Sequence, residues 1–179
     1  MINREKRTVS RGINHVGLTV PNLQQATEFL QKALDARFVY DGLTDSDSPR
    51  EGADTERQLG LTEGSMIIKQ RLLRIGNGPN LELFEIVSRE QAQPVRLQDF
   101  GWNHISLYVD DIHYAVERVR AAGGQFLSEI HGNSRHEDTD GNASVYFKAP
   151  WGGLIELQSI PNGYYYPEDS EADTWIPER

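Results

Sequence analysis

The sequence predicts an α+β fold of two βαβββ modules that form a concave mixed sheet with helices on its outer face. Three observations predict it. The segment 13–23 recurs at 102–112, with Asn, His, Leu and Val at matching places. Each copy alternates in polarity like a half-buried strand and then changes to helical spacing of its apolar residues. The two halves also end alike, in the apolar stretches 80–86 and 153–160, each with one Glu between aliphatic neighbours.

The elements of the first half follow in order along the chain. After the strand of segment 13–23, apolar residues recur three and four apart from Leu23 to Leu34, with Asn22 placed to cap the helix. Two further strands are expected near Arg37–Tyr40 and Met66–Ile75, before the Glu-bearing strand at 80–86. The polar segment Thr44–Glu63 between them is expected to be a lid or a disordered loop.

The second half repeats this order with a shorter connection. A helix is expected from Ile112 to Val119, capped by Asp110 or Asp111 and ended by Gly123-Gly124. Two strands are expected near 125–127 and 144–148, before the Glu-bearing strand at 153–160.

These elements predict one domain over residues 1–160, with modules at 13–88 and 102–160 joined by a linker at 89–101. Residues 161–179 form a C-terminal tail that is polar but aromatic. Because it holds Tyr164, Tyr165, Tyr166 and Trp175, we expect it to dock on its own domain or on a partner subunit.

Composition excludes several classes of protein. The 179 residues carry 27 acidic and 18 basic side chains, a net charge of −9, which disfavours nucleic acid as a partner. The absence of cysteine excludes disulfides, thiolate metal sites and a cysteine nucleophile. No apolar stretch approaches the roughly 20 residues that span a bilayer, and the N-terminus lacks the apolar region of a secretory signal. A cytoplasmic protein without membrane contact is expected.

Side-chain alternation along the strands selects four candidate site residues. In the first strand Val16, Leu18 and Val20 share one face, so His15 points the other way. The same argument turns Glu82, His104 and Glu156 away from the core. If the modules pair about a pseudo-two-fold axis, the four side chains meet on one concave sheet.

Two imidazoles and two carboxylates suit one divalent metal ion, namely Zn, Ni, Co, Mn or Fe, with positions left open for substrate. A lone His at a strand start is usually a surface residue, and a lone Glu in such a strand usually faces solvent. The recurrence of both at matched places favours metal ligation by His15, Glu82, His104 and Glu156. Glu85 has the parity of the core residues and is expected elsewhere.

The segments Asn14–Pro21, Leu81–Leu83, Trp102–Leu107 and Gly153–Leu157 resemble the vicinal oxygen chelate superfamily. That superfamily includes glyoxalase I, methylmalonyl-CoA epimerase, extradiol dioxygenases, and bleomycin and fosfomycin resistance proteins. The resemblance covers about residues 13–160 and places the same four residues at the metal-ligand positions. It also implies a homodimer, whose site lies either within one chain or between chains that exchange modules.

Departures from the family pattern narrow the expected substrate. The position where glyoxalase I commonly has a glutathione-binding Arg is Thr19, and the usual Asp-Pro-Asp-Gly turn is Ala149-Pro150-Trp151-Gly152. Methylmalonyl-CoA epimerase typically has Gln where Glu82 stands. The first departure argues against glutathione, and the opening strand is more similar to the epimerase branch.

The leading hypothesis is a metal-dependent isomerase, epimerase or lyase of the glyoxalase type, acting on a small oxygenated substrate. It would abstract a proton next to a metal-chelated carbonyl, with Glu156 as the first choice for the base and Glu82 as the other. One alternative is an iron-dependent extradiol-type dioxygenase, which Glu82 disfavours by filling a position that oxygen would need. The other is a non-catalytic, resistance-type binding protein.

Overall fold

The computed structural model of the protein describes residues 10–178, and the predicted repeat is visible in its element order. The first module contains β1 (His15–Thr19), α1 (Leu23–Leu34), β2 (Arg37–Leu43), α2 (Ala53–Leu59), β3 (Met66–Arg74) and β4 (Asn80–Val87). The second contains β5 (His104–Tyr108), α3 (Ile112–Ala122), β6 (Gln125–Phe126), β7 (His131–Gly132), a 3-10 turn (Arg135–Glu137), β8 (Ala143–Lys148) and β9 (Leu154–Ser159).

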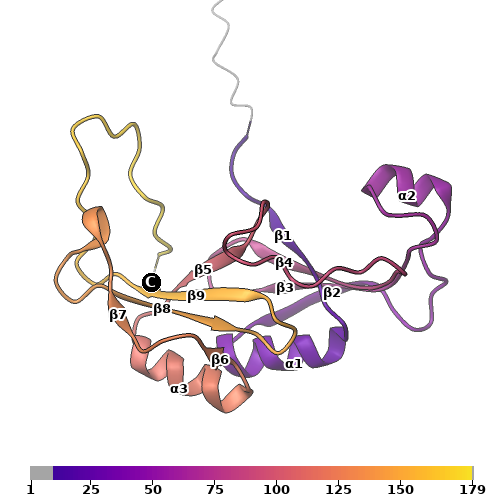
Figure 1. Ribbon diagram of the computed structural model, residues 1–179, viewed down its shortest axis with the longest axis horizontal. Coiled ribbons are helices and arrows are strands. Elements are labelled where there is room, and N and C mark those ends of the chain that lie inside the picture. The colour runs from indigo at the N-terminus through magenta and orange to yellow at the C-terminus, as the bar shows by residue number, and fades with distance from the viewer. Residues whose placement is uncertain (1–9, 179) are drawn as a thin grey trace, which may run out of the picture.

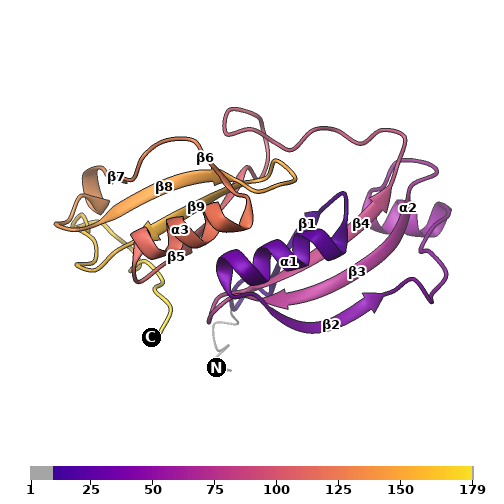
Figure 2. The ribbon, with the colours of Figure 1, turned by 90° about the horizontal axis from the view of Figure 1, so that it is seen from below.

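Each module has its own mixed sheet, and the two sheets share one topology. The strand order is β1-β4-β3-β2 in the first sheet and β5-β9-β8-β6 in the second, with β7 paired to β8. In each sheet the first strand runs parallel to the last, and the other pairs are antiparallel. The helices α1 and α3 lie side by side on one side of the sheets (Figures 1 and 2). The α+β prediction of two βαβββ modules is confirmed.

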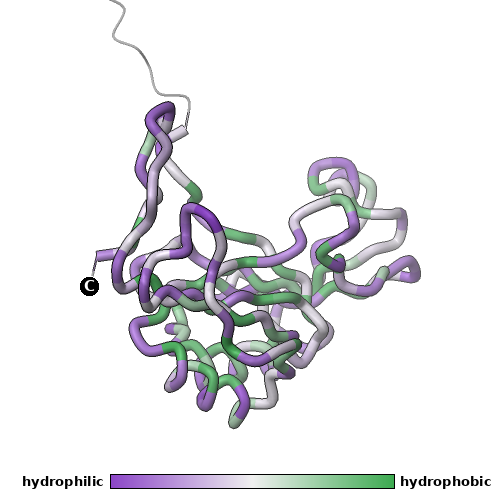
Figure 3. The backbone as a smooth tube through the Cα atoms, turned by 60° about the vertical axis from the view of Figure 1, so that its left-hand side comes forward, coloured by the Kyte–Doolittle hydropathy of each residue, from purple (hydrophilic) through white to green (hydrophobic). Residues whose placement is uncertain are grey.

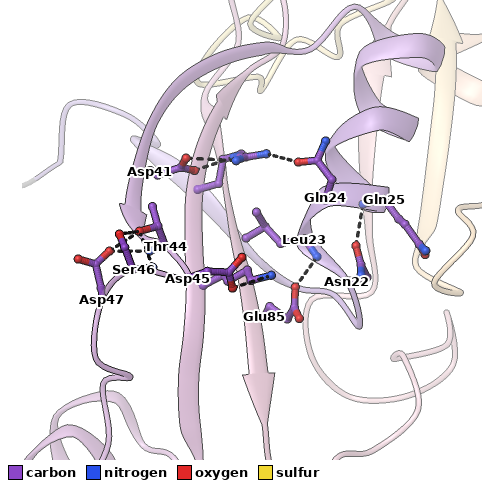
Figure 4. A network of polar contacts seen from close by, with 12 residues as sticks. Asn22, Leu23, Gln24, Gln25, Asp41, Thr44, Asp45, Ser46, Asp47 and Glu85 are labelled. Carbon is purple, nitrogen blue, oxygen red and sulfur yellow. Dashed lines mark hydrogen bonds and ion pairs between the residues drawn. The ribbon is translucent and has the colours of Figure 1, made fainter.

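Side-chain caps fix where the two long helices begin. The Asn22 carboxamide oxygen accepts a hydrogen bond from the Gln25 amide at 2.8 Å, as predicted. The carboxylate of Glu85 accepts from the Leu23 amide at 2.7 Å, so a negative charge from β4 lies at the positive end of α1 (Figure 4). Helix α3 is capped by Asp111, the second of the two predicted candidates, and ends at Gly123.

The modules share one hydrophobic core beneath the sheets. Phe29 of α1 packs edge-on against Trp151 at 5.5 Å between ring centres, and it also contacts Phe147 of β8. The altered turn before β9 therefore supplies an aromatic ring to the core. Arg118 of α3 donates to the Lys32 carbonyl at the end of α1, so a polar clamp joins the same two helices.

Two segments differ from the sequence-based expectation. The polar segment Thr44–Glu63, expected to be a lid or a disordered loop, contains the helix α2. This helix has no side-chain cap and no buried residue, so the sequence showed neither a capping motif nor an apolar periodicity that would predict it. Strand β2 runs to Leu43, three residues past the expected end, and pairs with β3 through two register shifts.

The side of the sheets opposite α1 and α3 carries other segments. The tail after β9 and the α2 segment both rise on that side, at opposite ends of the molecule (Figure 1), and both are largely hydrophilic (Figure 3). Within residues 10–178, every helix is too short or too polar to cross a membrane.

Candidate metal and substrate site

The four candidate ligands lie on the helix-free faces of the two sheets. Val16 and Leu18 pack against the core, and Val20 is fully buried in it, so the expected parity of β1 is confirmed. On β4, Leu81 and Leu83 are likewise buried. Strands β5 and β9 repeat this pattern, with Ile105, Leu107, Ile155 and Leu157 on the core side.

In the first module, the His15 Nε2 atom lies 3.2 Å from the Glu82 carboxylate. The other ring nitrogen, Nδ1, is 2.8 Å from the Asn14 carboxamide oxygen. The other carboxylate oxygen of Glu82 accepts a hydrogen bond from Gln70 Nε2 at 2.5 Å. Both partners of the pair are therefore oriented by a neighbouring amide.

The second module contains the same pair at equivalent positions. His104 Nε2 lies 3.8 Å from the Glu156 carboxylate, and His104 Nδ1 lies 2.6 Å from the Asn103 carboxamide oxygen. The Tyr146 ring packs edge-on against the His104 ring, with 5.4 Å between ring centres. Burial, and then the negative charge of Glu156, raise the pKa of the Tyr146 phenol to about 12, so it stays a neutral hydrogen-bond donor at physiological pH.

This arrangement fits a cation between each imidazole and its carboxylate. A carboxamide oxygen can only accept, so Asn14 and Asn103 hold the proton on Nδ1 and leave the Nε2 lone pair facing the carboxylate. Two acceptors that face each other are stabilised by a positive charge between them, and a divalent cation can supply it. Bonds of about 2.0–2.2 Å from one metal place neighbouring donor atoms roughly 3.0–3.5 Å apart. The His15–Glu82 pair, at 3.2 Å, lies within this range, and the His104–Glu156 pair, at 3.8 Å, lies slightly beyond it.

The chain presents these ligands as two half-sites rather than one cluster. Among residues 10–178, no group of three His, Asp or Glu side chains is close enough together to hold a metal ion. The first half-site is His15 with Glu82, and the second is His104 with Glu156. Glu85 lies apart from both, at the start of α1, as expected from its parity.

Sequence reasoning missed two residues that contact the half-sites, namely Gln70 and Tyr146. A signal for Tyr146 was present, because it alternates with the buried Val145 and Phe147 and so shares a face with Glu156, its register partner on β9. No comparable signal identified Gln70, because its contact with Glu82 depends on the register between β3 and β4.

Two βαβββ modules that each carry a His–Glu pair define a vicinal oxygen chelate fold. A family profile for the glyoxalase/bleomycin resistance protein/dioxygenase superfamily matches residues 14–146, and the chain belongs to this superfamily. A 2-epi-5-epi-valiolone epimerase from an Actinomyces species is 30% identical over 167 residues, which cover 93% of this chain and 88% of that protein.

Solved structures show the same fold at low identity. A glyoxalase family protein from Bacillus cereus aligns with a TM-score of 0.65 and 18% identity, covering 90% of this chain and 98% of that one. A fosfomycin resistance protein from Listeria monocytogenes, in complex with Mn(II) and 1S,2S-dihydroxypropylphosphonic acid, aligns with a TM-score of 0.52 and 21% identity. That alignment covers 83% of this chain and 89% of the Listeria protein.

Proposed function

We propose that the protein is a metal-dependent epimerase of a polyhydroxylated cyclic ketone. The observation that carries this proposal is the pair of matched half-sites, in which an Asn-oriented imidazole faces a carboxylate in each module. The 30% identity to an epimerase supports the reaction class and suggests the substrate. By its chemical name, 2-epi-5-epi-valiolone is a cyclohexanone that carries several hydroxyl groups.

The proposal includes a homodimer in which each site combines the first half-site of one copy with the second half-site of the other. Two ligands hold a metal ion weakly, whereas four ligands complete its shell. Ile13 lies two residues before His15, and Trp102 two residues before His104. Both are large apolar residues exposed to solvent, as is Phe100, so a second copy would cover them at the place where the half-sites need completing.

In this proposal the two carboxylates carry the proton chemistry. A divalent cation held by His15, Glu82, His104 and Glu156 would act as a Lewis acid toward the negative charge that forms on the substrate's carbonyl oxygen. Glu156, nearly buried beside Tyr146, takes the proton from the carbon next to the carbonyl, and the C–H electron pair moves toward the carbonyl oxygen. Glu82, protonated at the start of the cycle, gives its proton to the opposite face of that carbon, which inverts it. Solvent then carries the proton from Glu156 back to Glu82, so both groups regain their starting states.

Two measurements on the same preparation test the proposal. Elemental mass spectrometry is expected to find about one divalent metal ion per chain, and proton NMR in D₂O is expected to show exchange at the carbon beside the carbonyl of 2-epi-5-epi-valiolone. The Glu156→Gln variant should slow that exchange by about 10²–10⁴-fold, while exposed Glu129→Gln serves as the matched control. Retained exchange in Glu156→Gln would remove the assigned base. A protein without metal, even after incubation with Zn, Ni, Co, Mn or Fe, would contradict the proposal.

An oxygen electrode separates the proposal from ring-cleaving chemistry. An epimerase consumes no oxygen, whereas an extradiol-type dioxygenase consumes oxygen and requires Fe(II). Oxygen uptake with a catechol in the Fe(II)-loaded protein would replace the epimerase proposal by the dioxygenase alternative.

A further inference from the structure

The C-terminal tail folds back onto the helix-free face of the second sheet. The hydroxyl groups of Tyr164, in the tail, and Tyr108, on β5, lie 2.6 Å apart. The Tyr108 hydroxyl also donates to the backbone carbonyl of Trp175 at 3.2 Å. Of the two docking places expected for the aromatic tail, its own domain and a partner subunit, these contacts show the first.

Several polar contacts hold the tail in this position. The side chain of Asn142, which is buried, donates to the Gly163 carbonyl at 2.8 Å. The Tyr165 amide donates to the His136 carbonyl at 2.7 Å. At the far end, Asn77 in the β3–β4 turn donates to the Glu178 carbonyl at 2.9 Å, so the tail reaches the first module as well.

The docking point is adjacent to the second half-site. Tyr108 and Gln158 are register partners on β5 and β9, and each lies two residues beyond the pair Ser106 and Glu156 on the same face. At about 3.3 Å per residue, this separation is roughly 7 Å, which is close to the width of a six-membered ring with its substituents. A ring with its reacting carbon at Glu156 can therefore reach Tyr108, Gln158 and Tyr164 when it lies along the strands toward the tail.

The hydroxyl network leaves hydrogen-bonding capacity for a ligand. Each tyrosine hydroxyl has one proton. When the Tyr108 hydroxyl donates its proton to the Trp175 carbonyl, the Tyr164 hydroxyl donates its own proton to the Tyr108 oxygen. The Gln158 carboxamide oxygen lies 3.5 Å from the Tyr164 hydroxyl, which allows only a weak contact. The Gln158 oxygen and the lone pairs of Tyr164 can then accept hydrogen bonds from substrate hydroxyl groups.

Two further features of this region suit a hydroxylated ligand. Burial, followed by the hydrogen bond to Tyr108, raises the pKa of Tyr164, which keeps its phenol neutral at physiological pH. Tyr164 also lines an open hollow of about 680 Å³ within the tail, together with Tyr166 and Asp173. The equivalent positions of the first module are Thr19 and Phe84, so this polar arrangement belongs to the second module alone.

We propose that Tyr164, Tyr108 and Gln158 form a tail wall that selects polyhydroxylated substrates by hydrogen bonding to hydroxyl groups remote from the reacting carbon. This inference rests on the proposed epimerase function, because that function places the reacting carbon of the substrate ring at Glu156. It assigns the tail a role in specificity, whereas the half-sites carry out the chemistry.

The test compares Tyr164→Phe with Tyr165→Phe, a neighbouring tail residue whose exposed hydroxyl has no hydrogen bond among residues 10–178. The probes are 2-epi-5-epi-valiolone and 2-hydroxycyclohexanone, which has two adjacent oxygens but no remote hydroxyl. Titration of the metal-loaded protein gives Kd, and deuterium exchange gives KM and kcat. Tyr164→Phe should weaken the binding of 2-epi-5-epi-valiolone about 3- to 10-fold, as expected for the loss of one hydrogen bond. Its metal content and its binding of 2-hydroxycyclohexanone should not change.

Binding and deuterium exchange together separate a failure of the tail wall from a failure of the epimerase proposal. Equal binding of 2-epi-5-epi-valiolone by wild type, Tyr164→Phe and Tyr165→Phe would overturn the tail wall and leave the epimerase proposal intact. Binding by wild type without deuterium exchange would overturn the epimerase, whereas weaker binding by Tyr164→Phe would still support the wall. If wild type does not bind 2-epi-5-epi-valiolone, the tail wall and the proposed substrate are both overturned.

Discussion

Mixing two inactive variants tests whether a site is shared between copies of the chain. One variant, His15→Ala/Glu82→Gln, removes the first half-site, and the other, His104→Ala/Glu156→Gln, removes the second. Each variant alone keeps only two of the four ligands, so each should lose its metal on dialysis against a weak chelator. Because none of these substitutions alters a core residue, both variants should fold.

The expected recovery follows from the two half-sites in each chain. Random exchange of subunits in an equal mixture gives about one half mixed dimers. In a mixed dimer, one shared site combines the two damaged half-sites, and the other combines the two intact ones. One of every two sites is then complete in half of the dimers, so the mixture should regain about one quarter of the wild-type metal content and of the exchange rate.

The assay is elemental analysis after the two variants have been unfolded together and refolded. Native mass spectrometry with a mass tag on one variant confirms that mixed dimers have formed, and a mixture of wild type with tagged wild type serves as the control. A mixture that contains mixed dimers but no metal would refute the shared site, because it would show that each site is built within one chain. A chain that remains monomeric at all concentrations would refute the dimer itself.

The other predictions concern residues around the site and the core. Asn103→Ala should weaken metal affinity about 10- to 100-fold, because the imidazole loses the group that orients it; competition with a chelator measures this. Gly124→Ala would drive a methyl group into the Val119 side chain and should cost about 1–3 kcal/mol in urea unfolding, whereas Gly132→Ala, with nothing within 4 Å, should be nearly neutral. Arg118→Ala removes the clamp on the end of α1 and should lower the free energy of unfolding by about 1 kcal/mol.

Local patterns in the sequence contained most of the fold. Strand parity requires only that successive side chains alternate, so the core faces of β1 and β5 could be predicted from a few residues each. The cap at Asn22 and the end of α3 at Gly123 follow from equally local chemistry. The superfamily was recognisable for the same reason, because its signature consists of short strands with one polar residue among apolar neighbours.

What the sequence did not reveal depends on contacts between distant segments. Helix α2 has no buried face, so its periodicity carried no apolar signal. The Gln70–Glu82 contact depends on the register of two strands, and β3 contains a register shift that no residue pattern indicated. Where the two half-sites lie relative to each other is also non-local, since the modules of one chain pack together through α1 and α3 and not through the strands that carry the His–Glu pairs.

The two modules are alike in their His–Glu pairs and unlike two residues further along the strands. His15 and Glu82 correspond in register to His104 and Glu156, whereas Phe84 corresponds to Gln158. A metal ion accepts a symmetric ligand set, but the proposed epimerase would have to hold its substrate so that one carbon faces two different carboxylates. That orientation requires an asymmetric neighbourhood. The residues beyond the His–Glu pairs provide one, with Thr19 and Phe84 in the first module and Tyr108 and Gln158 beneath the tail in the second. Exchanging Gln158 for Phe would place the same residue at this position in both modules, and we expect it to impair substrate orientation while sparing metal binding.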